Sequence, residues 1–294
     1  MNTFILYTLA FSQEELYDRF YDPPTGLNFR SAIDKILEKH PSNSFVIPVN
    51  WVHFSKDGSV MEYKSLMDKV NENFKRNNVP IVFDLPMNAT NSANVTHITD
   101  NYETDVYNNG NAGDLIFQKY GIDKRSVLNI FSGAWNMSFA PIITSKADSV
   151  FLDALNEKSA IPVTLTHEIG HWLGLAHTFQ GTGCNDLNND YVKDTPVIDI
   201  AANGEGKRRN LDCTAVLDTC NPKKGPELLN NFMDYTNAQC QTSFTMGQSF
   251  RMANFAYYRL NNKLHTLVDS SFRIDCPEKD QLPHKLTQLE KQMN

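Results

Sequence analysis

Three histidines and one glutamate fall within eleven residues near the middle of the chain, in the string His167-Glu168-Ile-Gly-His171-Trp-Leu-Gly174-Leu-Ala-His177. On an α-helix, positions i and i+4 share one face, so the imidazoles of His167 and His171 can bind one ion. A helix can end at Gly174, because glycine adopts the left-handed conformation without a Cβ clash. The chain can then reverse and bring His177 to the same ion. Three imidazoles leave the fourth tetrahedral position to water, which is typical of a catalytic zinc site.

Zinc in such a site lowers the pKa of its water to about 7 and polarises a bound carbonyl group. Glu168 directly follows a ligand, so its carboxylate can reach that water without binding the ion and can act as a general base. The alternatives are an ordinary polar surface or a structural metal clip. The combination of Glu168, Gly174 and His177 with the spaced histidine pair disfavours both. The pattern therefore predicts hydrolytic chemistry with one catalytic Zn²⁺.

The eleven-residue string resembles the metzincin clan of zinc endopeptidases, and segments downstream narrow the resemblance to the pappalysin (cytophagalysin-like) family. These segments are His177-Thr-Phe179, Asp190-Tyr-Val-Lys-Asp194-Thr-Pro196, Asn231-Phe-Met233-Asp-Tyr235-Thr and Phe244-Thr-x-Gly-Gln248-x-x-Arg251-Met252. The resemblance implies that Met233 lies in a tight turn beneath the zinc without binding it. It also implies that Tyr235 stabilises the oxyanion of the tetrahedral intermediate. Without the family, Met233 would be a core residue and Tyr235 a half-buried aromatic.

A segment rich in oxygen ligands, Asp186-Leu-Asn188-Asn-Asp190-Tyr-Val-Lys-Asp194-Thr195, has the composition of a calcium site. It begins like an EF-hand loop. However, Tyr191 replaces the required glycine and Val197 replaces the final glutamate, so an EF-hand is excluded. The family resemblance implies structural calcium at Asp190, Asp194 and Thr195. The alternative is a solvated turn.

All five cysteines, Cys184, Cys213, Cys220, Cys240 and Cys276, lie in the second half of the chain. None forms a Cys-x-x-Cys pair, so a cysteine-based structural zinc site is not expected. Four clustered cysteines in a loop-rich stretch favour two disulfides and an oxidising compartment, the alternative being free thiols in a cytosolic protein. The sequence leaves three pairings of these four open. The family resemblance implies Cys184–Cys220 and Cys213–Cys240, and the partner of Cys276 stays open.

The elements that must position these residues follow from hydrophobic periodicity. Strands are predicted over 45–54, 80–85, 126–131 and 149–152. Helices are predicted after the capping box Ser59-x-x-Glu62, over 114–120, from about Ile161, and after the capping box Thr245-x-x-Gln248. Strands alternating with helices predict a mixed sheet with right-handed crossovers. After about residue 180 regular periodicity is lost.

These elements and the resemblance together predict an α+β fold of the metzincin type, the catalytic domain spanning residues 45–272. Its upper lobe, 45–174, is expected to hold a twisted mixed β-sheet and two main helices, one of them the active-site helix. Its lower lobe, 175–272, is expected to be irregular, stapled by disulfides and closed by a C-terminal helix. Residues 1–44 are interpreted as a leader or pro-segment, with a possible short signal at 1–12, and residues 273–294 as a polar tail.

Composition limits the possible partners. Lysine and arginine total 27 against 34 aspartates and glutamates, which gives a net charge of −7 and argues against general binding of nucleic acid. No apolar run reaches the roughly 18–20 residues of a membrane helix, so no membrane span is expected. We therefore expect a secreted zinc-dependent endopeptidase acting on peptide or protein substrates. The alternatives are a catalytically silent zinc-binding adhesion or recognition domain, and a zinc amidase acting on a non-peptide substrate.

Overall fold

The computed structural model describes residues 44–87, 94–99, 106, 112–122, 125–135, 137–141, 147–154, 161–180, 183–184, 190–192, 194–199, 211–220 and 225–260. Apart from Ser44, the predicted leader and the predicted tail lie outside these residues, as do Asp186, Asn188 and Cys276. The domain boundaries proposed from the sequence therefore stay predictions. Within the described part of the chain, no helix is long and apolar enough to cross a membrane.

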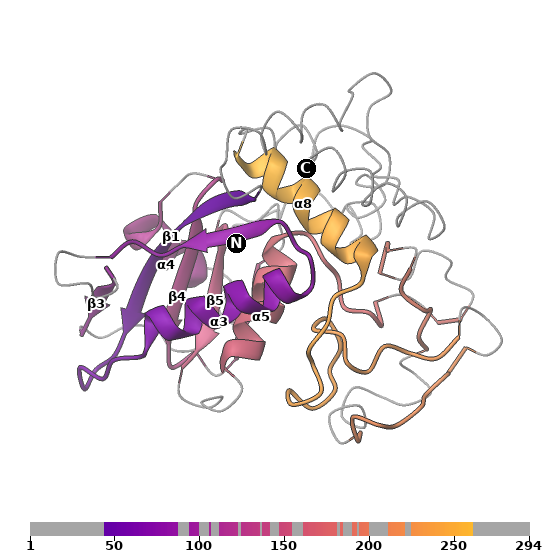
Figure 1. The fold of residues 1–294 in the computed structure, drawn as a ribbon. Coiled ribbons are helices and arrows are strands. Elements are labelled where there is room, and N and C mark those ends of the chain that lie inside the picture. Colours follow the sequence, from indigo (N-terminus) through magenta and orange to yellow (C-terminus); the bar gives the residue numbers. More distant parts are fainter. Residues whose placement is uncertain are drawn as a thin grey trace, which may run out of the picture.

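A parallel β-sheet forms the centre of the molecule (Figure 1). Its order is β2-β1-β4-β5, and β3 pairs with the far end of β1. The strands are β1 (Phe45–Phe54), β2 (Ile81–Asp84), β3 (Thr96–Ile98), β4 (Leu128–Gly133) and β5 (Ser149–Asp153). Every pair of these strands is parallel, so the prediction of a mixed sheet is wrong for them. The antiparallel contact among the described residues is the isolated bridge between Phe139 and Phe151.

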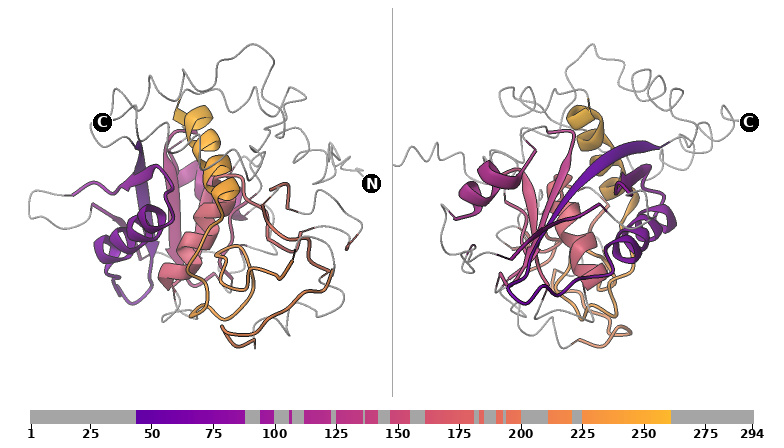
Figure 2. Two further views of the ribbon diagram at one scale, coloured as in Figure 1. Left: turned by 45° about the vertical axis from the view of Figure 1, so that its right-hand side comes forward. Right: turned by 90° about the vertical axis from the view of Figure 1, so that its left-hand side faces the viewer.

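Helices cover both faces of this sheet. The helices α3 (Tyr63–Arg76), α5 (Ile161–Trp172) and α8 (Met246–Leu260) lie on one face, and α4 (Ala112–Tyr120) lies on the other, as the right-hand view of Figure 2 shows. Alternation along β1 explains this, because successive side chains of a strand point to opposite faces. Trp51 belongs to the core under α3, α5 and α8, whereas Val52 belongs to the core under α4. Strands β4 and β5 are buried along their whole length, as expected for a parallel sheet covered twice.

The two predicted capping boxes differ in outcome. At the start of α8, the Gln248 backbone N–H donates to Thr245 Oγ1, and the Thr245 N–H donates to Gln248 Oε1, which confirms the reciprocal pattern. At the start of α3, Glu62 itself is the N-cap residue and makes no side-chain cap bond. Ser59 instead lies in a turn with Asp57, whose Oδ1 accepts from the Ser59 N–H. The first of the two predicted boxes is therefore wrong.

Two disulfides link the irregular part of the chain between α5 and α8. They join Cys184 to Cys220 and Cys213 to Cys240, which confirms the pairing implied by the family resemblance. Of the described residues between Leu173 and Thr245, none lies in a helix or a ladder of strands. The predicted loss of periodicity is thus confirmed, whereas the division of the molecule into two lobes stays a prediction.

Candidate metal centre

Helix α5 brings His167 and His171 onto one face, as their spacing predicts, and His177 reaches the same point from beyond its end. His171 Nε2 lies 3.0 Å from His167 Nε2 and 3.1 Å from His177 Nε2. Nitrogen ligands about 2.0–2.1 Å from a tetrahedral zinc are about 3.3 Å apart, so this triad has nearly the spacing that zinc requires. Among the residues that the structure describes, one group of three or more His, Cys, Asp or Glu side chains lies close enough together to hold a metal ion. This group is formed by these three histidines.

Backbone carbonyls orient two of the rings. His167 Nδ1 lies 2.6 Å from the Phe232 carbonyl oxygen, and His171 Nδ1 lies 2.8 Å from the Leu175 carbonyl oxygen. A carbonyl only accepts, so each Nδ1 donates its proton and each Nε2 presents a lone pair to the centre. Such bonds from the outer ring nitrogen fix the tautomer and rotation of a metal-binding histidine. The ring of His177 is instead stacked on Phe179, with centroids 4.8 Å apart.

Burial and the neighbouring rings also lower the basicity of two of the histidines. Burial, followed by the nearby His167, lowers the pKa of His171 to about 3. Burial, followed by His171 and His167, lowers the pKa of His177 well below 6.5. Both imidazoles are therefore neutral near pH 7, which is the form that binds metal. A cluster of neutral nitrogen donors suits Zn²⁺ rather than Ca²⁺ or Mg²⁺, which prefer oxygen.

The turn after α5 explains how His177 reaches its companions. Gly174 has a φ of +85°, and its N–H donates to the His171 carbonyl at 2.8 Å. The Leu175 N–H then donates back to the Gly170 carbonyl at 3.0 Å, which closes the end of the helix. The predicted helix end at Gly174 is thus found in the structure. A side chain there would also clash with Phe255, since an added Cβ would lie 2.3 Å from the ring.

The segment around Met233 packs against α5 and contacts His167. Met233 is fully buried, and its sulfur packs so closely on α5 that a Cβ added at Gly170 would lie 2.6 Å from it. The Thr178 N–H donates to the Met233 carbonyl at 3.1 Å, and Thr178 Oγ1 donates to Asp234 Oδ2 at 3.0 Å. This segment therefore fixes the chain just after His177 as well as the orientation of His167.

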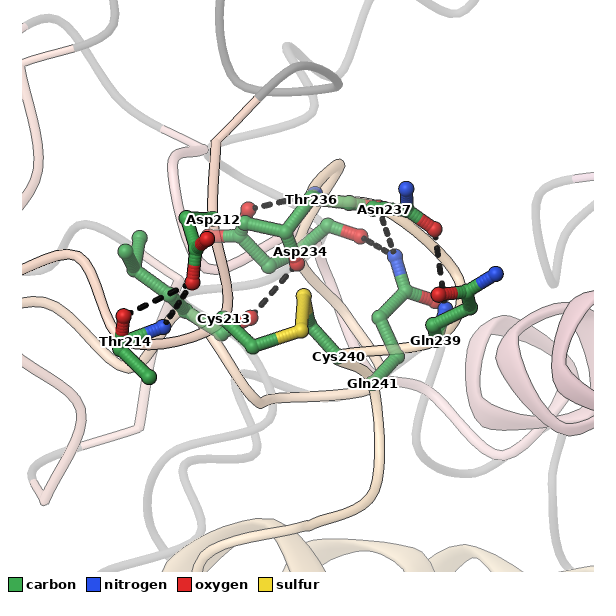
Figure 3. Close-up of a disulfide and its surroundings, with 10 residues drawn as sticks. Asp212, Cys213, Thr214, Asp234, Thr236, Asn237, Gln239, Cys240 and Gln241 are labelled. Atoms are coloured by element: carbon green, nitrogen blue, oxygen red, sulfur yellow. Dashed lines mark hydrogen bonds between the residues drawn. A yellow bond between two sulfur atoms is a disulfide. The ribbon is translucent and has the colours of Figure 1, made fainter.

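Tyr235 stands beside the same cluster. Its ring centroid lies 4.5 Å from that of His177 and 6.0 Å from that of His167, and the residue is half-buried. Gln241 Nε2 donates to the backbone carbonyls of both Asp234 and Thr236, so it bridges the residues on either side of Tyr235 (Figure 3). Gln241 adjoins the Cys213–Cys240 disulfide, which ties this bridge to the rest of the irregular segment.

Three other residues support the centre without having been predicted to do so. Gly170 lies inside the histidine string, and its missing side chain is what lets Met233 approach α5. Gln248 serves the capping box but also exchanges two hydrogen bonds with Asn231, whose Oδ1 in turn accepts from the Met233 N–H. No motif in the sequence pointed to Gln241, which bridges the backbone on both sides of Tyr235. Such roles depend on which segments meet in space, so spacing along the chain could not reveal them.

The residues proposed for calcium are used in two places. Asp190 Oδ1 accepts from the Val192 N–H and from Thr195 Oγ1 within one buried turn. Asp194 instead reaches the start of α8, where it accepts from Thr245 Oγ1 at 2.7 Å and from the Gly247 N–H at 2.8 Å. These bonds give the three residues a structural role without any ion. Calcium at Asp190, Asp194 and Thr195 therefore stays a prediction.

Comparison with known proteins agrees with this geometry. Residues 138–256 match a peptidase family model described as pregnancy-associated plasma protein-A. An extracellular metalloprotease of Colletotrichum graminicola is 45% identical over 92 residues, which are 31% of this chain and 30% of that protein. An extracellular metalloprotease of Sordaria macrospora is 44% identical over 99 residues, which are 33% of this chain and 31% of that protein. The matched part thus spans about three-tenths of the length of these relatives.

The fold is also similar to solved structures of mirolysin. A mirolysin in complex with compound 9 has a TM-score of 0.58 and 22% identity, and the match covers 78% of this chain and 96% of that one. Mature mirolysin of Tannerella forsythia in complex with a cleaved peptide has a TM-score of 0.53 and 21% identity, with 78% and 99% covered. At these identities the likeness shows the fold alone.

Proposed function

We propose that the chain is a secreted zinc-dependent endopeptidase of the pappalysin family, on the basis of the family match over residues 138–256. The observation that carries the proposal is the convergence of the imidazoles of His167, His171 and His177, whose ligand atoms lie within 4.8 Å of one another. Two disulfides and the names of the relatives, extracellular metalloproteases, support secretion. The peptidase family match and the names of these relatives support a peptide or protein substrate.

Glu168 is the proposed general base. It directly follows His167 on α5 and is only 6% exposed, so we place its carboxylate next to the proposed zinc site. A zinc ion on the three imidazoles would supply a Lewis acid and a water molecule of lowered pKa. The Glu168 carboxylate accepts the proton of the attacking water and then passes it to the amine nitrogen released from the peptide. One carboxylate thereby serves both halves of the hydrolysis.

Tyr235 is the proposed oxyanion stabiliser. Its ring packs against His177, and the bridge made by Gln241 holds the backbone on both sides of it. A phenol is a neutral donor that can form a hydrogen bond to the carbonyl oxygen as negative charge develops there. Such a donor acts on the transition state more than on the bound substrate, so it raises the rate of the chemical step.

The test compares Glu168→Gln with the parent chain on a denatured protein substrate, with cleavage read from new N-termini. Glu62→Gln, an exposed glutamate with no side-chain cap bond, is the matched control. We expect Glu168→Gln to bind zinc like the parent and to lose at least about 10²-fold in rate, as for removal of a general base. Glu62→Gln should match the parent in both. Zinc binding with no new N-termini in the parent would instead indicate a silent domain or an amidase, and would refute the proposal.

A further inference from the structure

One face of α8 contacts the turn after α5, which separates the proposed zinc ligand His171 from His177. Arg251, Phe255 and Arg259 are spaced four residues apart, so they form one stripe along the helix. All three are almost completely buried, which is unusual for two arginines in the core of a small protein. Each contacts the short stretch from Trp172 to Gly174, which immediately follows His171. Figure 1 shows α8 running beside the end of α5.

The contacts are specific. Arg251 Nε donates to the Gly174 carbonyl oxygen at 2.7 Å, and Arg259 Nη2 donates to the Trp172 carbonyl oxygen at 2.7 Å. The guanidinium of Arg259 also stacks on the Trp172 ring, 3.6 Å from its centroid. Between the two arginines, the Phe255 ring occupies the space where a side chain of Gly174 would lie. The turn is therefore held by two charged donors and by one aromatic ring.

Helix chemistry explains why arginines occur here. The last carbonyls of an α-helix have no partner within the helix, and its C-terminal end carries partial negative charge. Arg259 meets both needs at the carbonyl of Trp172, the last residue of α5, and Arg251 binds the Gly174 carbonyl in the turn that follows. A buried arginine needs a counter-ion, and Arg259 has Asp148, whose two carboxylate oxygens accept three hydrogen bonds from the guanidinium at 2.9–3.1 Å. Asp148 directly precedes β5, so Arg259 links the turn after α5 to the edge of the sheet.

We propose that Arg251 and Arg259 are positioning residues of the metal centre, acting through the path of the chain from His171 to His177. This inference rests on the proposed zinc function. His171 is held in place by α5. The chain after His177 is held by the hydrogen bonds of Thr178 to Met233 and Asp234. The residues between them have no helix to hold them. The α8 stripe therefore decides how closely the third imidazole approaches the other two.

The test measures metal binding rather than activity. The variant Arg251→Met keeps the length of the side chain but removes the donor to Gly174. The control Ile116→Ala truncates a buried residue of α4, on the opposite face of the sheet from α8. Each protein is first shown to be folded by circular dichroism. Its Zn²⁺ dissociation constant is then measured by competition with a chelating dye, and the visible absorption of the Co²⁺ form is recorded.

We expect Arg251→Met to weaken Zn²⁺ binding by about 10-fold or more, in the range typical of losing a group that orients metal ligands, and to alter the Co²⁺ spectrum. Ile116→Ala should lower the melting temperature but leave both metal readouts as in the parent. A folded Arg251→Met with parental affinity and spectrum would overturn the inference while leaving the proposed function intact. If Arg251→Met does not fold, Arg251→Leu, which also lacks a donor, is judged by the same criteria. A parent chain that fails to bind zinc would refute the proposed function itself.

Discussion

Gly174→Ala changes the glycine of the turn that ends α5, and the structure allows its cost in stability to be worked out. The backbone there has a φ of +85°, a conformation that costs an L-residue about 1–2 kcal/mol. The new methyl would lie 2.3–2.5 Å from three atoms of the buried Phe255 ring. Overpacking of this kind costs about a further 1–3 kcal/mol. We therefore expect a total loss of about 2–5 kcal/mol in the free energy of unfolding.

Two further variants separate these contributions. Gly58 has a similar φ of +72° but nothing within 4 Å of an added Cβ, so Gly58→Ala should cost only the conformational part, about 1–2 kcal/mol. Phe255→Ala alone should cost about 3–5 kcal/mol. Combined with Gly174→Ala, it removes the ring that causes the clash. The double variant should therefore be less destabilised than the sum of the two single variants by about 1–3 kcal/mol.

The assay is urea denaturation of the metal-free proteins, followed by circular dichroism at one pH. Equal losses for Gly174→Ala and Gly58→Ala would refute the reasoning, because the contact with Phe255 would then cost nothing. Strict additivity in the double variant would refute it too.

Two other predictions concern the tyrosine and a buried histidine. Tyr235→Phe keeps the ring against His177 but removes the phenol, so kcat should fall by about 10²-fold while the Zn²⁺ dissociation constant stays unchanged; an unchanged kcat would exclude the oxyanion role. Burial, and to a smaller extent the nearby His97, lowers the pKa of His53 in the folded protein. The unfolded chain therefore binds a proton at this histidine more readily than the folded chain, and the free energy of unfolding falls as the pH drops below about 6.5. His53→Gln should reduce the loss of unfolding free energy between pH 7.5 and 5.0, and equal pH dependence in the two proteins, by urea denaturation, would contradict this.

Much of the framework could be predicted from local sequence. The run of residues that favour strands in β1 and the helical spacing in α5 and α8 place these elements nearly where the structure has them. The histidine string predicts a metal site by itself, because its geometry is that of one helical turn and one glycine. The disulfides follow from the family resemblance, since spacing alone left three pairings open.

The remainder depends on contacts between distant segments. β3 has only three residues in a polar stretch, and only its pairing with β1 makes it a strand. Strand direction is likewise set by connections in space, which is why the parallel sheet was predicted as mixed. Ser59 carries a capping pattern, but the turn with Asp57 uses it instead. The roles of Gly170 and Arg251 appear only once α5 meets Met233 and α8.

The central claim is that His167, His171 and His177 bind one zinc ion together. The most direct measurement is a titration of the metal-free chain with Zn²⁺, with bound metal counted by elemental analysis, alongside His177→Ala. The account predicts one tightly bound zinc per chain in the parent, and a large loss of affinity in a variant that remains folded. Tight, equal binding of one zinc by His177→Ala would contradict it, because the third imidazole would then not be a ligand.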